Sequence, residues 1–439
     1  MKRAWLGRSA ILISSLITAF LSLWVTPGSA TAAGGDLDPT FGQDGRVVTR
    51  IGDQSYVVAV ALQSYGRVIA AGTTRTDGDA DFALARYHSD GSLDTTFGTD
   101  GVVTTDFGTR HDAVSGVVGQ GESNIIVAGA KQRGERRTWI VARYDGSGVL
   151  DVGFARNGWA TIGFGRALGS DLVASEVSDV GLQSDGKIIV AGSALDLNTY
   201  VSYLAIARLN RNGSVDRSFG DDGRVLARSP GGGTVGAMAL LPNDRILMGG
   251  SSITGGDAFR DFAITRYLPD GEIDPSFEPA TTDFGPNDNV NDLALGAGGS
   301  FVAAGTGDPL PDQEEGFAIA RYRADGSPDP TFSGDGRQFT KVGAGLPPYL
   351  YAVAVQTDQR VVAAGYAYLE RKPVIALTRY RENGSLDPSF GGDGRIYTTV
   401  LDFSVATDVL VQPNGAILAG GGTTGARGDR FALVRYLAS

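Results

Sequence analysis

The chain has 439 residues, of which 64 are glycine and none is cysteine, and its formal net charge at pH 7 is −11. Without cysteine it forms no disulfide and supports neither a thiol nucleophile nor a zinc-thiolate site. Its acidic balance repels phosphate backbones, which excludes nucleic acid as the main partner. The abundant glycines indicate tight turns between short strands, and we therefore expect an all-β fold.

The N-terminus has the pattern of a secretory signal peptide. Lys2 and Arg3 precede the apolar run Ala10–Val25, and small, helix-breaking residues follow it. The run is shorter than the roughly 20 residues that a membrane span needs, although an uncleaved anchor is the competing interpretation. We expect residues 1–33 to be removed and residues 34–439 to form one secreted or cell-surface domain without a membrane span.

Four short strands are predicted after the signal peptide, in the first complete repeat. They are Tyr56–Leu62, Val68–Ala71, Phe82–Tyr87 and Val102–Thr105, which are alternating, continuously apolar, alternating and β-branched in turn. Asp-Gly or similar pairs separate the first and second strands of several repeats, as a tight hairpin requires. The four strands are therefore expected to form one antiparallel sheet.

The same pattern recurs to the end of the chain, with one phenylalanine and one arginine anchoring each copy. The phenylalanines are Phe41, Phe97, Phe154, Phe219, Phe277, Phe332 and Phe390. The arginines are Arg86, Arg143, Arg208, Arg266, Arg321, Arg379 and Arg435, spaced 55 to 65 residues apart. Seven copies of about 57 residues, each with four strands, predict a seven-bladed β-propeller.

The two ends of the chain are complementary. Arg46–Ile51 has the pattern of a fourth strand without its first three, and the chain stops after a third-type strand, Phe431–Tyr436. We expect the N-terminal strand to pair into the last blade and to close the ring, which leaves no open sheet edge.

The repeat resembles a known family. The blocks Leu37–Gly42, Val180–Gly192 and Phe82–Tyr87 are similar to the delta-60 repeat of bacterial secreted and surface proteins. The resemblance covers essentially the whole chain after the signal peptide and implies no common activity. The fifth copy departs from the pattern, because Glu278 replaces a glycine and no Asp-Gly-Arg follows it. We expect its turn before the fourth strand to differ.

Seven aspartates accompany the arginines, each three residues before the repeated phenylalanine. They are Asp38, Asp94, Asp151, Asp216, Asp274, Asp329 and Asp387. A guanidinium and a carboxylate can form a bidentate pair in every repeat. Because a catalytic site is normally single, we interpret both sets of residues as structural.

Antiparallel strand order divides the connections between two rims. The constant rim carries the turns between first and second strands and between third and fourth strands. The variable rim carries connections that differ in every copy, and we expect any function there. Its loops between second and third strands are Thr73–Asp81, Ala130–Thr138, Ser193–Ser202, Ser251–Asp261, Thr306–Gly316, Tyr366–Pro373 and Gly421–Arg430.

One variable loop is a candidate calcium site. Asp77, Asp79 and Asp81 alternate along it and offer carboxylate oxygens, the ligands that Ca²⁺ prefers. The glycine and distal glutamate of an EF-hand loop are missing, and a solvated acidic turn is the alternative. The sequence indicates no other cofactor.

Two further sets of polar residues are candidates for ligand binding on the variable rim. Asp283, Asn287, Asp288 and Asn289 precede a first strand, where capping of the loop by their side chains is the alternative interpretation. His111 lies in a second such connection. Because no histidine pair has metal spacing and no Gly-x-Ser-x-Gly elbow is present, we assign no catalytic residue.

The leading functional hypothesis is a monomeric binding module that recognises a protein or a glycan through the variable rim. The alternative is an extracellular hydrolase or lyase with carboxylates at the mouth of the propeller channel. Convergent carboxylates or His111 at that mouth would favour the enzyme, whereas an aromatic or apolar patch would favour the binding module.

Overall fold

The computed structural model describes residues 33–134, 136–164, 172–228, 235–253, 259–307, 315–426 and 428–438. The predicted signal peptide, apart from residue 33, lies outside these residues. The described part consists of β-strands joined by turns, with single 3-10 turns at Ser64–Gly66 and Ala297–Gly299. None of its helices is long and apolar enough to cross a membrane.

The strands form antiparallel groups of four, each called a sheet here and named after its first strand. Single bridges from Ala80 to His111 and from Ala174 to Arg137 also join the β2, β6 and β10 groups into one twelve-stranded sheet. The β2 sheet contains β2 (Gln54–Leu62), β3 (Val68–Thr76), β4 (Asp79–Tyr87) and β5 (Val102–Thr105). The β6 sheet contains β6 (His111–Gln120), β7 (Asn124–Arg133), β8 (Arg136–Tyr144) and β9 (Trp159–Ile162). The β10 sheet contains β10 (Leu172–Leu182), β11 (Ile188–Asp196), β12 (Ser202–Leu209) and β13 (Arg224–Arg228).

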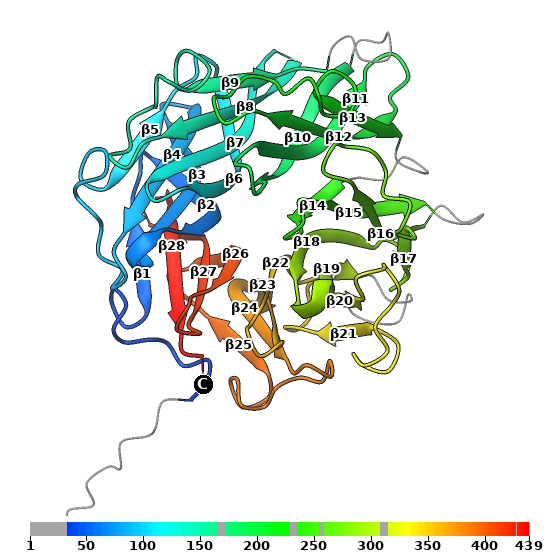
Figure 1. Cartoon of the computed structure of the whole chain (residues 1–439). Helices are drawn as coiled ribbons and strands as arrows, with labels where there is room; N and C mark the ends of the chain where they lie inside the picture. The colour runs from blue at the N-terminus through cyan, green and yellow to red at the C-terminus, as the bar shows by residue number, and fades with distance from the viewer. Residues whose placement is uncertain are drawn as a thin grey trace, which may run out of the picture. The chain divides into compact units, whose positions relative to one another are not determined.

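The remaining sheets follow in chain order (Figure 1). The β14 sheet contains β14 (Val235–Leu240), β15 (Ile246–Ile253), β16 (Arg260–Tyr267) and β17 (Ala280–Thr282). The β18 sheet contains β18 (Asn289–Leu295), β19 (Phe301–Gly307), β20 (Gly316–Tyr322) and β21 (Arg337–Lys341). The β22 sheet contains β22 (Tyr349–Val355), β23 (Val361–Leu369), β24 (Lys372–Tyr380) and β25 (Arg395–Thr398). The β26 sheet contains β26 (Phe403–Val411), β27 (Ile417–Gly425), β28 (Gly428–Tyr436) and β1 (Arg46–Thr49).

The second and third strands are longer than predicted. β3 and β4 pair as far as Thr76 and Asp79, which leaves Asp77 and Gly78 as a two-residue turn with φ of 52° and 90°. Two positive φ values are typical of the turn that suits twisted hairpins. The prediction of a loop over Thr73–Asp81 is therefore wrong, because backbone pairing continues into polar residues beyond the apolar core.

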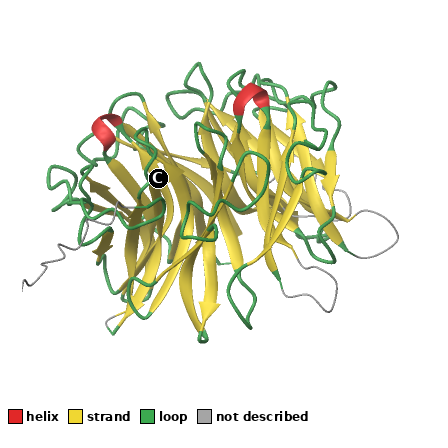
Figure 2. Cartoon of the chain, turned by 90° about the horizontal axis from the view of Figure 1, so that it is seen from below, coloured by secondary structure: helices red, strands yellow, loops and turns green. Residues whose placement is uncertain are grey.

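Consecutive sheets pack against each other through apolar faces. One core cluster joins Val302 of the β18 sheet to Val361 of the β22 sheet, and another joins Leu433 of the β26 sheet to Val57 and Val68 of the β2 sheet. The first strands contact one another in succession, and β26 also contacts β2. The fold is thus all-β and propeller-like, with loops gathered at the two ends of the strands (Figure 2).

The N-terminal strand lies beside the last strand of the chain (Figure 1). β1 pairs antiparallel with β28, from Arg46 opposite Val434 to Thr49 opposite Phe431. Upstream of this ladder, the backbone N–H of Asp38 donates to the carbonyl of Arg435 at 2.9 Å. The N-terminal segment therefore supplies the fourth strand of the β26 sheet.

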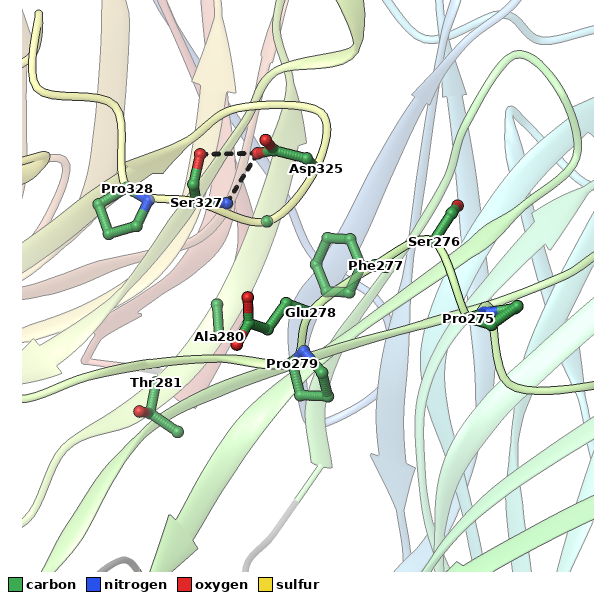
Figure 3. Close-up of a pocket in the computed structure, with 11 residues that line it drawn as sticks. Pro275, Ser276, Phe277, Glu278, Pro279, Ala280, Thr281, Asp325, Ser327 and Pro328 are labelled. Atoms are coloured by element: carbon green, nitrogen blue, oxygen red, sulfur yellow. Dashed lines mark hydrogen bonds between the residues drawn. The ribbon is translucent and has the colours of Figure 1, made fainter.

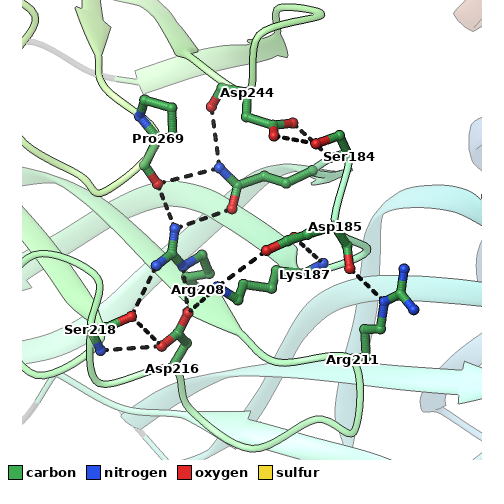
Figure 4. Close-up of polar contacts among 10 residues, drawn as sticks. Ser184, Asp185, Lys187, Arg208, Arg211, Asp216, Ser218, Asp244 and Pro269 are labelled. Carbon is green, nitrogen blue, oxygen red and sulfur yellow. Dashed lines mark hydrogen bonds and ion pairs between the residues drawn. The ribbon is translucent and has the colours of Figure 1, made fainter.

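The repeated arginines connect neighbouring sheets, as Arg208 illustrates (Figure 4). Its Nε lies 2.8 Å from Asp216, its NH1 donates to the carbonyl of Pro269 in the next sheet at 2.5 Å, and its guanidinium lies 4.7 Å from the centre of the Phe219 ring. Burial raises the pKa of Asp216, but hydrogen bonds from Ser218 and the nearby cations outweigh this effect and lower that pKa to about 2. The carboxylate therefore stays charged at neutral pH.

The same ion pair recurs along the chain with nitrogen–oxygen distances of 2.7–2.9 Å. The pairs are Arg86–Asp94, Arg143–Asp151, Arg208–Asp216, Arg266–Asp274, Arg321–Asp329, Arg379–Asp387 and Arg435–Asp38. Each arginine also donates to a backbone carbonyl beyond its own sheet, and Arg435 donates to Ser89 of the β2 sheet.

Candidate functional site

A pocket of about 630 Å³ opens on the constant rim where the fifth copy departs from the repeat (Figure 3). Elsewhere the residue after the repeated phenylalanine donates its N–H to the next sheet, as Gly98 does to Ser147 at 2.7 Å. Glu278 makes no such bond among the described residues, and β17 begins two residues later. The turn before the fourth strand therefore differs in this copy, as predicted from the sequence, and the pocket lies beside it. Its aspartate, Asp325, caps its own turn through Ser327.

His111 lines a smaller pocket of about 270 Å³ on the variable rim, between the β6 and β10 sheets. Arg137 and Glu176 lie on its wall and form an ion pair of 3.0 Å. Arg137 also donates to Gln132 at 3.2 Å. The pocket therefore holds both signs of charge beside the apolar side chains of Ala113, Ala130 and Val177.

The three aspartates of the predicted calcium loop do not come together. Asp77 lies in the β3–β4 turn, and Asp79 lies 3.9 Å from Arg110. Asp81 instead shares a site with Asp106 and Asp112, whose carboxylate oxygens lie within 4.8 Å of one another and of Asp81. Of the predicted ligands, only Asp81 lies where several carboxylates could share one cation.

The electrostatics of this group are unfavourable without a counter-charge. Oδ1 of Asp81 is buried and accepts no hydrogen bond. Burial, followed by repulsion from Asp106 and Asp112, raises the pKa of Asp81. A matching group of Asp261, Asp283 and Asp288 occupies the equivalent place between the β14 and β18 sheets.

In the second predicted cluster, most residues bond within their own loop, whereas one lies on the face of β18 that approaches β22. Asp288 is fully buried and accepts the N–H of Phe284, and Asp283 accepts the N–H of Gly285 at 2.8 Å. Asn287 forms a backbone bridge with Arg260. Asn289 differs, because its amide donates to the side chain of Asn291 at 2.8 Å on the face of β18 that approaches β22.

Four tyrosines form a cluster next to these asparagines, at the variable-rim end of the β22 sheet. The tyrosine cluster consists of Tyr349, Tyr351, Tyr366 and Tyr368. Ring centres of Tyr349 and Tyr351 are 4.6 Å apart, and those of Tyr366 and Tyr368 are 5.6 Å apart. Tyr349 pairs with Tyr366 across β22 and β23, with nearly parallel rings whose centres are 6.4 Å apart.

The neighbouring asparagine holds the cluster to the β18 sheet. Asn291 donates its amide N–H to the carbonyl of Leu350 at 2.7 Å, and the hydroxyl of Tyr349 lies 3.5 Å from its Oδ1. Burial raises the pKa of Tyr349 and Tyr351, and burial with repulsion between the phenols raises that of Tyr366 to about 12. These hydroxyls are therefore protonated donors at neutral pH.

Exposed aromatic side chains continue from this cluster along the variable rim. Tyr351 is 37% exposed, Phe403 at the start of β26 is 43% exposed, and Tyr56 near the start of β2 is 40% exposed. These residues lie at corresponding ends of first strands that contact one another. This surface was not predicted from the sequence, although Tyr-x-Tyr occurs on both paired strands of one repeat.

Three aspartates lie on the first strands; the sequence places only Asp292 among them in a polar cluster, the one that also contains Asp283. Asp179, Asp292 and Asp408 each follow a β-bulge, at a position where the other sheets have alanine or glycine. Asp292 accepts the N–H groups of Leu293 and, in the next sheet, Val353, both at 2.7 Å. These carboxyl groups therefore satisfy backbone groups where the bulge disrupts regular pairing.

Burial dominates the ionisation of these three aspartates. It raises the pKa of Asp179 to about 7 and that of Asp408 to about 6, and it raises the pKa of Asp292 as well. Asp408 adds to the effect at both other residues. The three carboxyl groups, which come from non-adjacent sheets, thus lie close enough to influence one another.

The four-stranded sheets repeat along the chain, and one arginine per repeat pairs with an aspartate and donates to a backbone carbonyl of the neighbouring sheet. This arrangement defines a β-propeller repeat protein. Five segments match the family described as "Domain of unknown function (DUF5122) beta-propeller", namely residues 63–97, 183–219, 241–277, 297–332 and 356–390. No curated protein matches the sequence.

Several solved propellers resemble the fold. The Dos1 propeller has a TM-score of 0.45 and 11% identity, with 88% of this chain and 94% of that chain covered. Drosophila Semaphorin 2a has a TM-score of 0.49 and 7% identity, with 93% and 77% covered. The periplasmic gluconolactonase PpgL of Pseudomonas aeruginosa has a TM-score of 0.47 and 12% identity, with 84% and 99% covered. These proteins differ in function and indicate none for this chain.

Proposed function

We propose that this protein is a secreted or cell-surface, seven-bladed β-propeller that binds a protein or glycan partner through its variable rim. The seven arginine–aspartate pairs support the blade count. The pairing of β1 with β28 and the bond from Arg435 to Ser89 support closure of the ring. A closed ring leaves its two rims as the main surfaces for recognition.

The tyrosine cluster is the observation that carries this proposal. Tyrosine offers a large amphipathic contact area with few rotatable bonds, and it is enriched at recognition surfaces. The cluster lies on the rim whose connections vary between repeats, and Phe403 and Tyr56 extend it. Exposed aromatic surface of this kind marks interaction sites on soluble proteins.

The test compares two exposed tyrosines on opposite rims. Arrays of glycans and of peptides are probed with the wild type, with Tyr351→Ala and with Tyr65→Ala; Tyr65 is 88% exposed in the β2–β3 turn of the constant rim. We expect Tyr351→Ala to weaken the affinity for the captured ligand at least tenfold, which corresponds to about 1.4 kcal/mol of binding free energy. Tyr65→Ala should bind the ligand with the affinity of the wild type. Equal capture by both variants would contradict the proposal.

An extracellular hydrolase or lyase is the second candidate, and the three aspartates on the first strands favour it. A carboxyl group with a pKa near 7, such as that of Asp179, suits general acid catalysis at neutral pH. On this alternative, Asp179→Asn abolishes turnover of chromogenic glycosides or esters. Turnover that survives the substitution excludes the role.

A further inference from the structure

The tyrosine cluster presents side chains in fixed and different orientations. The rings of Tyr349 and Tyr366 are inclined by only 13°, whereas those of Tyr366 and Tyr368 meet at 85°. Alternation along β23 places Tyr366 and Tyr368 on the same face as Val362 and Ala364, which pack against the β26 sheet. The cluster therefore continues the core between two sheets outward to the rim, where its ring faces and edges reach solvent.

Backbone recognition is not available on the strand that carries half of the cluster. β23 pairs with β22 on one side and with β24 on the other, so a peptide cannot extend the sheet there by strand addition. A ligand that lies over the side chains of β23 contacts aromatic faces and protonated phenol hydroxyls. Sugar rings match both features, because they combine flat C–H faces with hydroxyls that donate and accept hydrogen bonds.

The charge of the protein favours an uncharged glycan over an acidic one. The chain carries a net charge of −11, and the groups that adjoin the tyrosines from the β18 sheet are the neutral amides of Asn289 and Asn291. The β23–β24 turn next to Tyr368 carries Glu370, Arg371 and Lys372, so repulsion of a polyanionic glycan comes from the net charge of the whole chain. An uncharged glycan would not meet this repulsion.

We infer that the tyrosine cluster binds a neutral polysaccharide of equatorially linked pyranose rings, which present flat C–H faces to Tyr351 and Tyr366 and hydroxyls to the phenols. This inference rests on the proposed function and specifies its ligand. The equatorial linkage matters because it leaves both faces of each ring free of bulky substituents.

Calorimetric titration with cellohexaose and with N-acetylchitohexaose tests the inference. We expect Tyr351→Ala to weaken binding at least about tenfold, which corresponds to about 1.4 kcal/mol. Tyr351→Phe keeps the ring but removes one phenol hydroxyl, so it should bind more weakly than the wild type and more tightly than Tyr351→Ala. Tyr65→Ala serves as the matched control on the other rim. Polygalacturonate, an acidic glycan, should not bind. Unchanged melting temperatures establish that the variants are folded.

The outcomes separate the ligand class from the function. Absence of binding to both oligosaccharides, or binding that Tyr351→Ala leaves intact, overturns the inference. If a proline-rich peptide from the array binds in a Tyr351-dependent manner instead, the glycan class is wrong and the proposed function stands. If no ligand depends on the tyrosine cluster, both fail.

Discussion

Arg435 shows how a single side chain joins distant parts of the chain. Its Nε lies 2.9 Å from Asp38, its NH2 donates to Thr40 at 3.0 Å, and its guanidinium lies 4.5 Å from the centre of the Phe41 ring. Its NH1 donates to the carbonyl of Ser89. The side chains of both ion-pair partners are less than a tenth exposed, so neither charge is well solvated by water.

We predict that Arg435→Ala destabilises the protein by about 3 kcal/mol, because it leaves the buried carboxylate of Asp38 without its cation. Urea unfolding measures the change. Arg110→Ala is the control, since that side chain is 86% exposed and its removal should cost less than about 0.5 kcal/mol. Equal midpoints for both variants would show that the pair contributes nothing.

We predict that Asp81→Asn raises the melting temperature at pH 8 in buffer with a chelator. The substitution removes one charge from three crowded carboxylates, one of which has a buried oxygen without a partner. Asp77→Asn, in the exposed turn, is the control and should change little.

The same variants test the calcium hypothesis. Millimolar CaCl₂ should raise the melting temperature of the wild type and of Asp77→Asn, but not that of Asp81→Asn, if Asp81 holds the ion. An unchanged melting temperature in all three proteins would remove the hypothesis.

At the scale of elements, the first strands share a β-bulge but differ in the residue that follows it. Each has a register shift, and three of them place an aspartate directly after it. Asp408 bonds to the N–H groups of Val409 and, in the β2 sheet, Val60, both at 2.7 Å. The bulge thus exposes backbone donors that a side chain of the neighbouring sheet can reach.

We predict that stability rises as pH falls from 8 to about 5. The raised pKa values of Asp179 and Asp408, about 7 and 6 against an ordinary value of 3.8, mean that the folded protein binds more protons than the unfolded chain in this window. Below pH 4 the opposite sign applies, because the pKa of Asp216 and Asp38 is lowered and their protonation favours unfolding. Melting temperatures measured from pH 8 to below pH 4 test both the rise in stability and the later fall.

A triple variant tests whether the three carboxyl groups cause the change in stability between pH 8 and pH 5. Asp179→Asn/Asp292→Asn/Asp408→Asn keeps acceptors for the backbone N–H groups and removes the titration. Its melting temperature should change less than half as much between pH 5 and pH 8 as that of the wild type. A triple variant with the full wild-type slope would place the titration elsewhere.

The sequence was informative where the repeats agree and silent where they differ. The arginines, aspartates and phenylalanines recur, so their spacing predicts β-sheets of four strands and the apolar faces that pack together. Tyr351 and Asp179 occupy positions held by other residue types in other copies, and a prediction based on recurring residues does not identify them. Their grouping depends on bulge geometry and on contacts between sheets, neither of which a single strand pattern encodes.

For the whole molecule, the N-terminal segment contributes more than one strand of hydrogen bonds. β1 completes the β26 sheet, Asp38 neutralises Arg435, and Phe41 is fully buried in the core between the β26 and β2 sheets. Its removal would expose an edge of the sheet and vacate an aromatic site at the same time.

We predict that deletion of residues 36–51 destabilises the protein by about 6 kcal/mol or more, the sum of an unpaired buried arginine and a vacated phenylalanine site. Calorimetry of the deleted and full-length proteins measures the loss, and a synthetic peptide of residues 36–51 added in trans should restore part of it. A full cooperative transition at an unchanged midpoint would refute closure of the ring by this strand.

The pairing of β1 with β28 also has a mechanical consequence. The ladder is antiparallel and the two chain ends leave it on the same side, where Leu37 lies opposite Tyr436. Tension between Ala33 and Ala438 therefore opens the ladder one hydrogen bond after another instead of loading all of them together. A molecule held by both ends would yield first at this seam, at low force, while the other sheets stay intact.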